Sequence, residues 1–99
     1  MAQSICKVFL AKATEAWYEL SEDEQRLLLG KVNGALEQSG GKPIITCSSG
    51  WATEQWSFWG VEEYPDFEAL QKHDELLNAL NWFRFVDSTT TLGVRFQPA

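Results

Sequence analysis

Two different hydrophobic periods run along the chain, and together they predict four strands and two helices. Residues 5–12, 43–49 and 55–62 are rich in β-branched and aromatic residues, which is typical of strands. Residues 82–87, WFRFVD, predict a fourth strand, and the following TTTLGVRF is either its continuation beyond a bulge or a separate terminal strand. The link GWATE between the second and third strands is short enough for a hairpin.

The first predicted helix lies between the first two strands and begins with a capping box. In the stretch SEDE, Ser21 would cap the helix while the side chain of Glu24 returns a hydrogen bond. Gly40 and Gly41 predict its end. An apolar stripe at helical spacing would face the sheet, and it comprises Leu28, Val32, Ala35 and Leu36.

The second predicted helix follows the third strand. The stretch YPDF opens it with Asp66 as the cap, and Asn81 ends it. The element order is then strand, helix, strand, strand, helix, strand. In 99 residues this order predicts one domain over residues 1–99 with a ferredoxin-like α+β fold, an antiparallel sheet with both helices on one face.

The sheet is predicted to be apolar on both faces. Side chains alternate along a strand, so Trp56 and Phe58 point one way while Trp59 and Val61 point the other. Two helices cover only one face, and the second would leave a larger apolar patch than a monomer usually exposes. We therefore expect a homodimer that packs sheet against sheet through the open face.

The composition and charge of the chain argue against several classes of protein. The chain is 44% hydrophobic and 22% charged, as in globular domains, and its net charge of −6 argues against a nucleic-acid partner. The short apolar run at the start is broken by Lys7 and Lys12, so neither a secretion signal nor a membrane span is predicted, and a cytoplasmic location is expected. Cys6 and Cys47 have no metal-ligand spacing, and no metal site is expected.

Two residues are candidates for acid–base chemistry. His73 is the chain's one histidine and a natural proton carrier, although it also fits as a boundary residue on a solvated helix. Glu62 could serve as a general base near the end of the third strand, although the sequence shows no partner that would raise its pKa. No nucleophile elbow and no glycine-rich phosphate loop occurs.

Lys7 and Arg84 interrupt strands that are otherwise apolar. If both cations lined one cavity with Trp59, they would form an aromatic pocket with a positive floor, suited to an anionic or aromatic small molecule. The alternative is an ion pair with Glu62, Glu63 or Asp87, or a side chain extended to solvent at the sheet edge.

With these elements in place, the chain resembles the dimeric α/β-barrel superfamily over nearly its full length. WYELSEDEQR, from Trp17 to Arg26, is similar to the W-x-x-L-S-x-E-E-R opening of darcynin-like and related uncharacterised families. Trp59 and the stretch NWFRF after the second helix are also similar, while Gln25 stands for Glu and Asn81 for Gly. The resemblance implies a ferredoxin-like fold and a dimer, and it implies no particular reaction.

The same superfamily includes cofactor-independent monooxygenases and haem-degrading oxygenases. The resemblance implies that these use a pocket between the sheet and the second helix, with a third-strand Trp, a first-strand polar residue and often a helical His. Trp59 and His73 match in type, but His73 lies nearer the helix start and the first strand lacks the usual Asn. Two functions stay open: a dimer without a cofactor that binds a hydrophobic or anionic aromatic molecule, and a small oxygenase or isomerase.

Overall fold

The computed structural model describes residues 3–52 and 55–96. Four strands and four helices follow one another along these residues. They are β1 (Ile5–Ala13), α1 (Glu15–Tyr18), α2 (Glu22–Ser39), β2 (Lys42–Ser48), β3 (Phe58–Tyr64), α3 (Phe67–Ala79), α4 (Trp82–Phe85) and β4 (Val86–Gly93).

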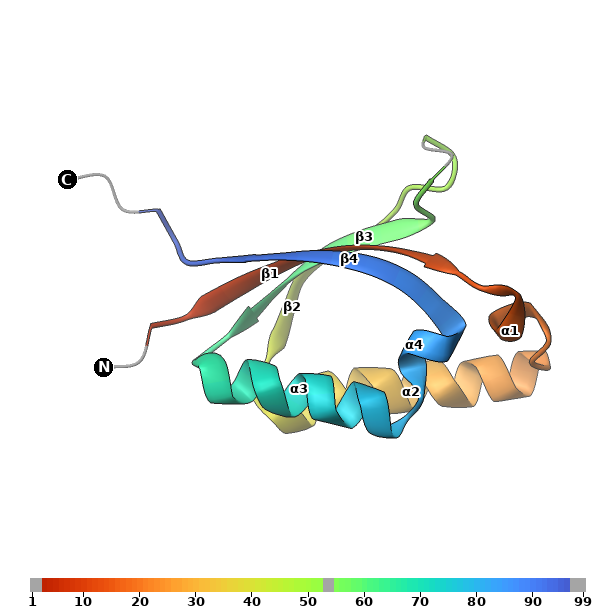
Figure 1. Ribbon diagram of the computed structural model, residues 1–99, viewed down its shortest axis with the longest axis horizontal. Coiled ribbons are helices and arrows are strands. Elements are labelled where there is room, and N and C mark those ends of the chain that lie inside the picture. Colours follow the sequence, from red (N-terminus) through yellow and green to blue (C-terminus); the bar gives the residue numbers. More distant parts are fainter. Residues whose placement is uncertain (1–2, 53–54, 97–99) are drawn as a thin grey trace.

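The strands form one antiparallel sheet in the order β2-β3-β1-β4. The two long helices, α2 and α3, lie together on one side of this sheet, which arches over them (Figure 1). Among the described residues no helix covers the other face. The predicted ferredoxin-like α+β fold is therefore confirmed.

The caps of both long helices are those that the sequence predicts. The backbone N–H of Glu24 donates to Ser21 Oγ at 3.1 Å, and the N–H of Ser21 donates to Glu24 Oε1 at 2.9 Å. These hydrogen bonds with Ser21 lower the pKa of the Glu24 carboxyl. Asp66 Oδ1 accepts from the N–H of Ala69 at 2.8 Å at the start of α3. Gly40 ends α2 with a φ of 89°, a left-handed conformation that glycine adopts without strain.

The predicted fourth strand is wrong in its first part. Residues 82–85 form the short helix α4. The strand is β4, which begins at Val86 within the predicted fourth strand and continues into the stretch TTTLGVRF. Asn81 turns the chain with a φ of 56°. The ring of Trp82 then packs edge-on against Trp17 at 6.2 Å, and Thr14 Oγ1 donates to the carbonyl of Arg84 at 2.7 Å. These long-range contacts override the strand preference of an aromatic segment.

Two further boundaries differ from the prediction. β3 begins at Phe58, so Trp56 precedes the strand. Residues 15–18 lie between the first predicted strand and the first predicted helix, and they form the helical turn α1, which carries Trp17 toward α4. Trp51 lies on a turn and is 86% exposed, with its Nε1–H donating to the carbonyl of Ser48 at 3.0 Å.

The alternation of faces holds along β1 and β3. Phe9 and Phe58 lie on the helix side, with ring centroids 6.1 Å apart. Val8 pairs with Val61, and Leu10 with Trp59, on the open side. The open face is also formed by β2, through Ile45 beside Val61. We refer below to the open face as the sheet surface made by Cys6, Val8, Leu10, Ile45, Cys47, Trp59 and Val61.

The tightly packed core lies at one end of the molecule. Tyr64, at the end of β3, is 0% exposed and packs with Leu36 of α2 and with Ala69 and Leu70 of α3, while Ile5 covers the group from β1. Because this cluster joins the sheet to both long helices, it fixes the layers relative to each other at that end.

Replacing Ser21 with alanine tests the first cap. Ser21→Ala removes the acceptor for the Glu24 N–H, and we expect a loss of about 1 kcal/mol in the free energy of unfolding. Denaturant titration of wild type and variant measures this loss. Ser4→Ala, at an exposed position outside any helix, is the control. Equal midpoints for Ser21→Ala and wild type would contradict a stabilising role for the capping box.

Candidate functional site

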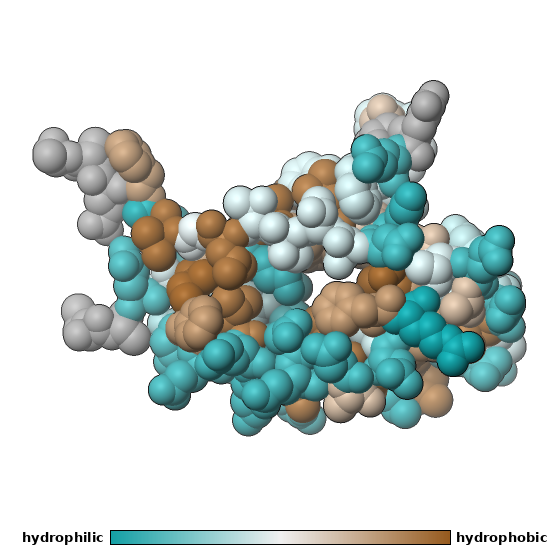
Figure 2. Space-filling model, viewed as in Figure 1, coloured by the Kyte–Doolittle hydropathy of each residue, from teal (hydrophilic) through white to brown (hydrophobic). Residues whose placement is uncertain are grey.

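A large cavity separates the sheet from the long helices. Its volume is about 1040 Å³, and its walls come from the helix-facing residues of all four strands and from α1, α2, α3 and α4. The space-filling view shows a hollow between the strands and the helices (Figure 2). Its walls are largely apolar, with Phe9, Leu29, Val32, Phe58, Leu77 and Val86 among the lining residues.

Aromatic and aliphatic side chains also line the two ends of this cavity. Trp17 and Trp82, the edge-to-face pair, line it where α1 and α4 meet. Phe67, at the start of α3, and Leu92, near the end of β4, line it as well and are 55% and 50% exposed. An apolar molecule would therefore meet hydrophobic side chains along the whole length of the cavity.

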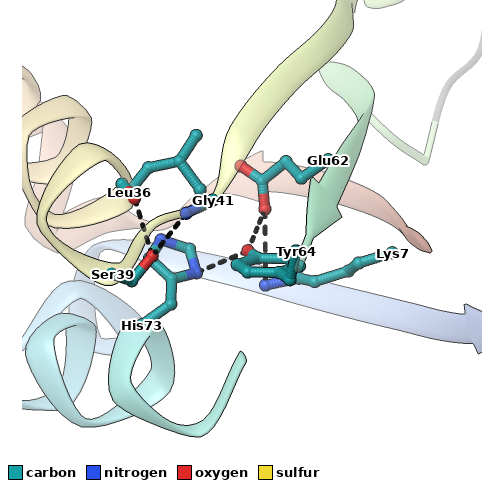
Figure 3. A network of polar contacts seen from close by, with 7 residues as sticks. All are labelled: Lys7, Leu36, Ser39, Gly41, Glu62, Tyr64 and His73. Atoms are coloured by element: carbon teal, nitrogen blue, oxygen red, sulfur yellow. Dashed lines mark hydrogen bonds and ion pairs between the residues drawn. The ribbon is translucent and has the colours of Figure 1, made fainter. Parts of the chain in front are cut away.

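One polar cluster interrupts these apolar walls (Figure 3). His73 Nδ1 on α3 lies 2.7 Å from Tyr64 Oη, and this hydroxyl donates to Glu62 Oε1 at 2.7 Å. Lys7 Nζ, from β1, lies 3.7 Å from the same Glu62 oxygen. The four side chains reach one place because Lys7 and Glu62 are paired across β1 and β3, and Tyr64 is two positions further along the same face.

The hydrogen bonds determine where the protons lie. A hydroxyl has one proton, and Tyr64 gives it to the Glu62 carboxylate, so it accepts from a protonated Nδ1 of His73. Burial, and then the charge of Lys7, lowers the pKa of His73 to about 4. Burial and the neighbouring Glu62 raise the pKa of Tyr64. At neutral pH the imidazole and the phenol are therefore both uncharged.

Three of the five sequence-predicted site residues meet in this cluster. Lys7, Glu62 and His73 all line the cavity. The ion pair of Lys7 with Glu62, which the sequence offered as one alternative, is present. Tyr64, which links His73 to Glu62, was missed. Its signal was its spacing, two residues after Glu62 in a strand, which places both on one face.

The predicted grouping of Trp59 with Lys7 and Arg84 is wrong. Trp59 is paired with Leu10 and so lies on the open face, whereas Lys7 is on the helix face. Arg84 is exposed on α4, with its guanidinium 6.0 Å from the Phe85 ring centroid. Side chains alternate between the two faces along a strand, so the sheet itself lies between Trp59 and Lys7. Arg84 belongs to the helix α4 and not to a strand.

The described residues contain no group of three or more His, Cys, Asp or Glu side chains suited to a metal ion. Cys6 and Cys47 are free thiols, both on the open face. Within the described ranges, no helix combines the length and the apolar character that crossing a membrane requires.

Comparison with known proteins finds relatives in structure alone. No protein-family model and no curated protein matches the sequence. A mutant chlorite dismutase from Candidatus Nitrospira defluvii is similar with a TM-score of 0.77 and 12% identity, over 96% of this chain and 41% of that chain. A putative chlorite dismutase has a TM-score of 0.72 and 17% identity, over 95% and 44%.

A protein of unknown function from Rhodopseudomonas palustris is similar over 99% of this chain and 86% of that one, with a TM-score of 0.68 and 18% identity. The chain thus spans less than half the length of the chlorite dismutases and most of the length of the Rhodopseudomonas palustris protein. These likenesses show the ferredoxin-like fold.

The buried histidine makes stability depend on pH. Because the folded-state pKa of His73 is near 4 and the ordinary value is 6.5, the unfolded chain binds more protons between these values. The free energy of unfolding should therefore fall as pH drops from about 6.5 toward about 4, by up to about 1.4 kcal/mol per pH unit from this residue.

Denaturant titrations of wild type and His73→Phe across this range measure the difference. The variant should lack this component of the pH dependence, while carboxylates shared by both proteins contribute equally. An imidazole that titrates near pH 6.5 in the NMR spectrum of the folded protein would contradict the prediction.

Proposed function

We propose that the protein binds a hydrophobic small molecule in the cavity between the sheet and the long helices. The cavity carries this proposal: its volume is about 1040 Å³, its lining side chains are mainly apolar, and a cluster of polar groups converges in its wall. Ligand sites are typically cavities of roughly 300–1,000 Å³ with apolar walls and a few converging polar groups. The combination of Phe9 and Phe58 near Lys7 and Glu62 has this character.

Filling the cavity should prevent this binding. Thr90 lines the cavity from β4, so Thr90→Phe should weaken ligand binding by about tenfold or more. Leu27→Phe, at an exposed position on α2 outside the cavity lining, should not. Thermal-shift and calorimetric titration with aromatic acids, aromatic alcohols and porphyrins measures the affinity. If no compound raises the melting temperature of wild type, or if both variants respond equally, the cavity is not a binding site.

We also propose that the protein is a homodimer joined through the open face. Val8 and Ile45 flank Val61 at the centre of this face and are 39% and 49% exposed in the single chain. Charged pairs lie at its two ends, Lys12 beside Asp87 and Lys42 with Glu63. An apolar centre with a charged rim is the usual anatomy of a protein interface. A dimer of this chain would also approach the length of one chlorite dismutase chain.

A charge at the centre of the open face should separate the two copies. Val61→Asp would bury an unpaired carboxylate in the interface, and we expect a monomer at micromolar concentration by sedimentation velocity. Leu27→Asp, at a 62% exposed position on α2, should remain dimeric. A single-subunit mass for the wild type would overturn the proposed dimer.

A relationship to the darcynin-like families is part of this proposal. The two stretches that carry the resemblance meet in the fold, because Trp17 of the first packs against Trp82 of the second. Gln25 also donates from Nε2 to the carbonyl of Trp17 at 3.0 Å, which holds α1 against the start of α2. The shared motifs thus form one structural unit at an end of the cavity.

The polar cluster favours a second candidate function, a small oxygenase or isomerase. Glu62 and His73 both line the cavity, and Tyr64 connects them, so a proton can be held at either end of this chain of hydrogen bonds. An iron porphyrin fits the donor chemistry of His73, since Nδ1 is engaged by Tyr64 and Nε2 is the nitrogen able to ligate. Such a group would supply oxygen activation when bound. Haemin titration of wild type and His73→Phe, followed by absorbance, distinguishes this candidate from simple binding.

A further inference from the structure

The charged side chains in the cavity wall do not form the positively charged floor that the sequence predicts. Among the described lining residues, Lys7 is joined by three carboxylates, those of Glu62, Asp74 and Glu75. His73 is uncharged at neutral pH because burial disfavours its charged form. Arg84, the other predicted cation, is not among the lining residues.

The charge of Lys7 is matched by a carboxylate that is itself held in place. Lys7 Nζ lies 3.7 Å from Glu62 Oε1, and both side chains are only 14% exposed. The hydroxyl of Tyr64, at 2.7 Å, fixes that same oxygen. An anion that approaches Lys7 would therefore meet the negative charge of Glu62 in a poorly solvated site, where repulsion between like charges is costly.

A neutral polar group meets no such obstacle. The Lys7 ammonium is beyond hydrogen-bond distance of Glu62 and makes no hydrogen bond with the described residues, so its N–H donors can reach a ligand oxygen. The Glu62 carboxylate has further lone pairs that can accept from a ligand hydroxyl. One hydroxyl can use both partners at once, accepting from Lys7 and donating to Glu62.

We propose that the ligand of this cavity has a neutral, oxygen-bearing head, an alcohol, phenol or ketone on an apolar body, and that Glu62 excludes the corresponding carboxylates. This inference rests on the proposed binding function and names the chemistry of the molecule bound there. Glu62 acts as the selectivity-determining residue, because it neutralises the cation that would otherwise attract an anion. Removal of its charge should convert the cavity into a site for anions.

Two probes with the same aromatic body test this selectivity. Pyrenemethanol carries a hydroxyl and pyrenecarboxylate an anion, and calorimetric titration at neutral pH gives the affinity of each. The affinity of wild type for the alcohol should exceed its affinity for the carboxylate by about tenfold or more. In Glu62→Gln, whose amide oxygen can still accept from Tyr64, the carboxylate should gain about tenfold in affinity. The alcohol loses its charged acceptor and should bind more weakly than to wild type.

Glu63→Gln is the matched control. It removes the same charge one position along β3, but Glu63 lies on the other side of the strand and pairs with Lys42 at 3.6 Å and Arg95 at 3.2 Å. The ratio of the two affinities should stay at its wild-type value. Lys7→Met provides a second variant, in which Glu62 is left without its cation and binding of the carboxylate should disappear.

The outcomes separate the inference from the function on which it rests. Binding of both probes by wild type with similar affinity, or an unchanged ratio in Glu62→Gln, overturns the neutral-head proposal and leaves a binding cavity. Tighter binding of pyrenecarboxylate by wild type overturns it as well. Failure of wild type to bind either probe removes the binding function and this inference together.

Discussion

The arrangement depends on the burial of one side chain, Tyr64. Its ring is completely excluded from solvent at the end of β3, packed against Leu36 and Leu70 of the two long helices. A buried hydroxyl requires hydrogen-bond partners, and Tyr64 finds one on each layer, Glu62 in the sheet and His73 in α3. The same residue thus joins the layers and links two of the polar groups that line the cavity, Glu62 and His73.

A second contact supports the opposite end of the layers. Trp17 and Trp82 pack edge to face where α1 and α4 meet, and Thr14 ties the two short helices together through the carbonyl of Arg84. With packing concentrated at Tyr64 and at this aromatic pair, the middle of the sheet stays away from the helices. The cavity is the space left between these two supports.

The sheet gives its two faces different tasks. Adjacent residues of β3 illustrate this, since Phe58 lines the cavity and Trp59 belongs to the open face. The same holds for neighbouring glutamates, because Glu62 meets Lys7 inside the cavity while Glu63 meets Lys42 at the rim of the open face. Gly60 of the same strand leaves room for the Phe9 ring, because a Cβ at position 60 would lie 2.7 Å from Phe9 Cζ. Ligand binding and association are therefore proposed for surfaces that do not compete.

The sequence by itself determined the features that local chemistry controls. Ser21 and Asp66 cap the helices because their side chains bond to N–H groups only three residues away, and strand alternation separates Phe58 from Trp59. Tertiary structure decided the rest. Residues 82–85 became a helix through contacts with Thr14 and Trp17, which are distant in sequence. Lys7, Glu62, Tyr64 and His73 became one cluster only when β1, β3 and α3 packed together, because the energy of a buried polar group depends on partners that the neighbouring sequence does not reveal.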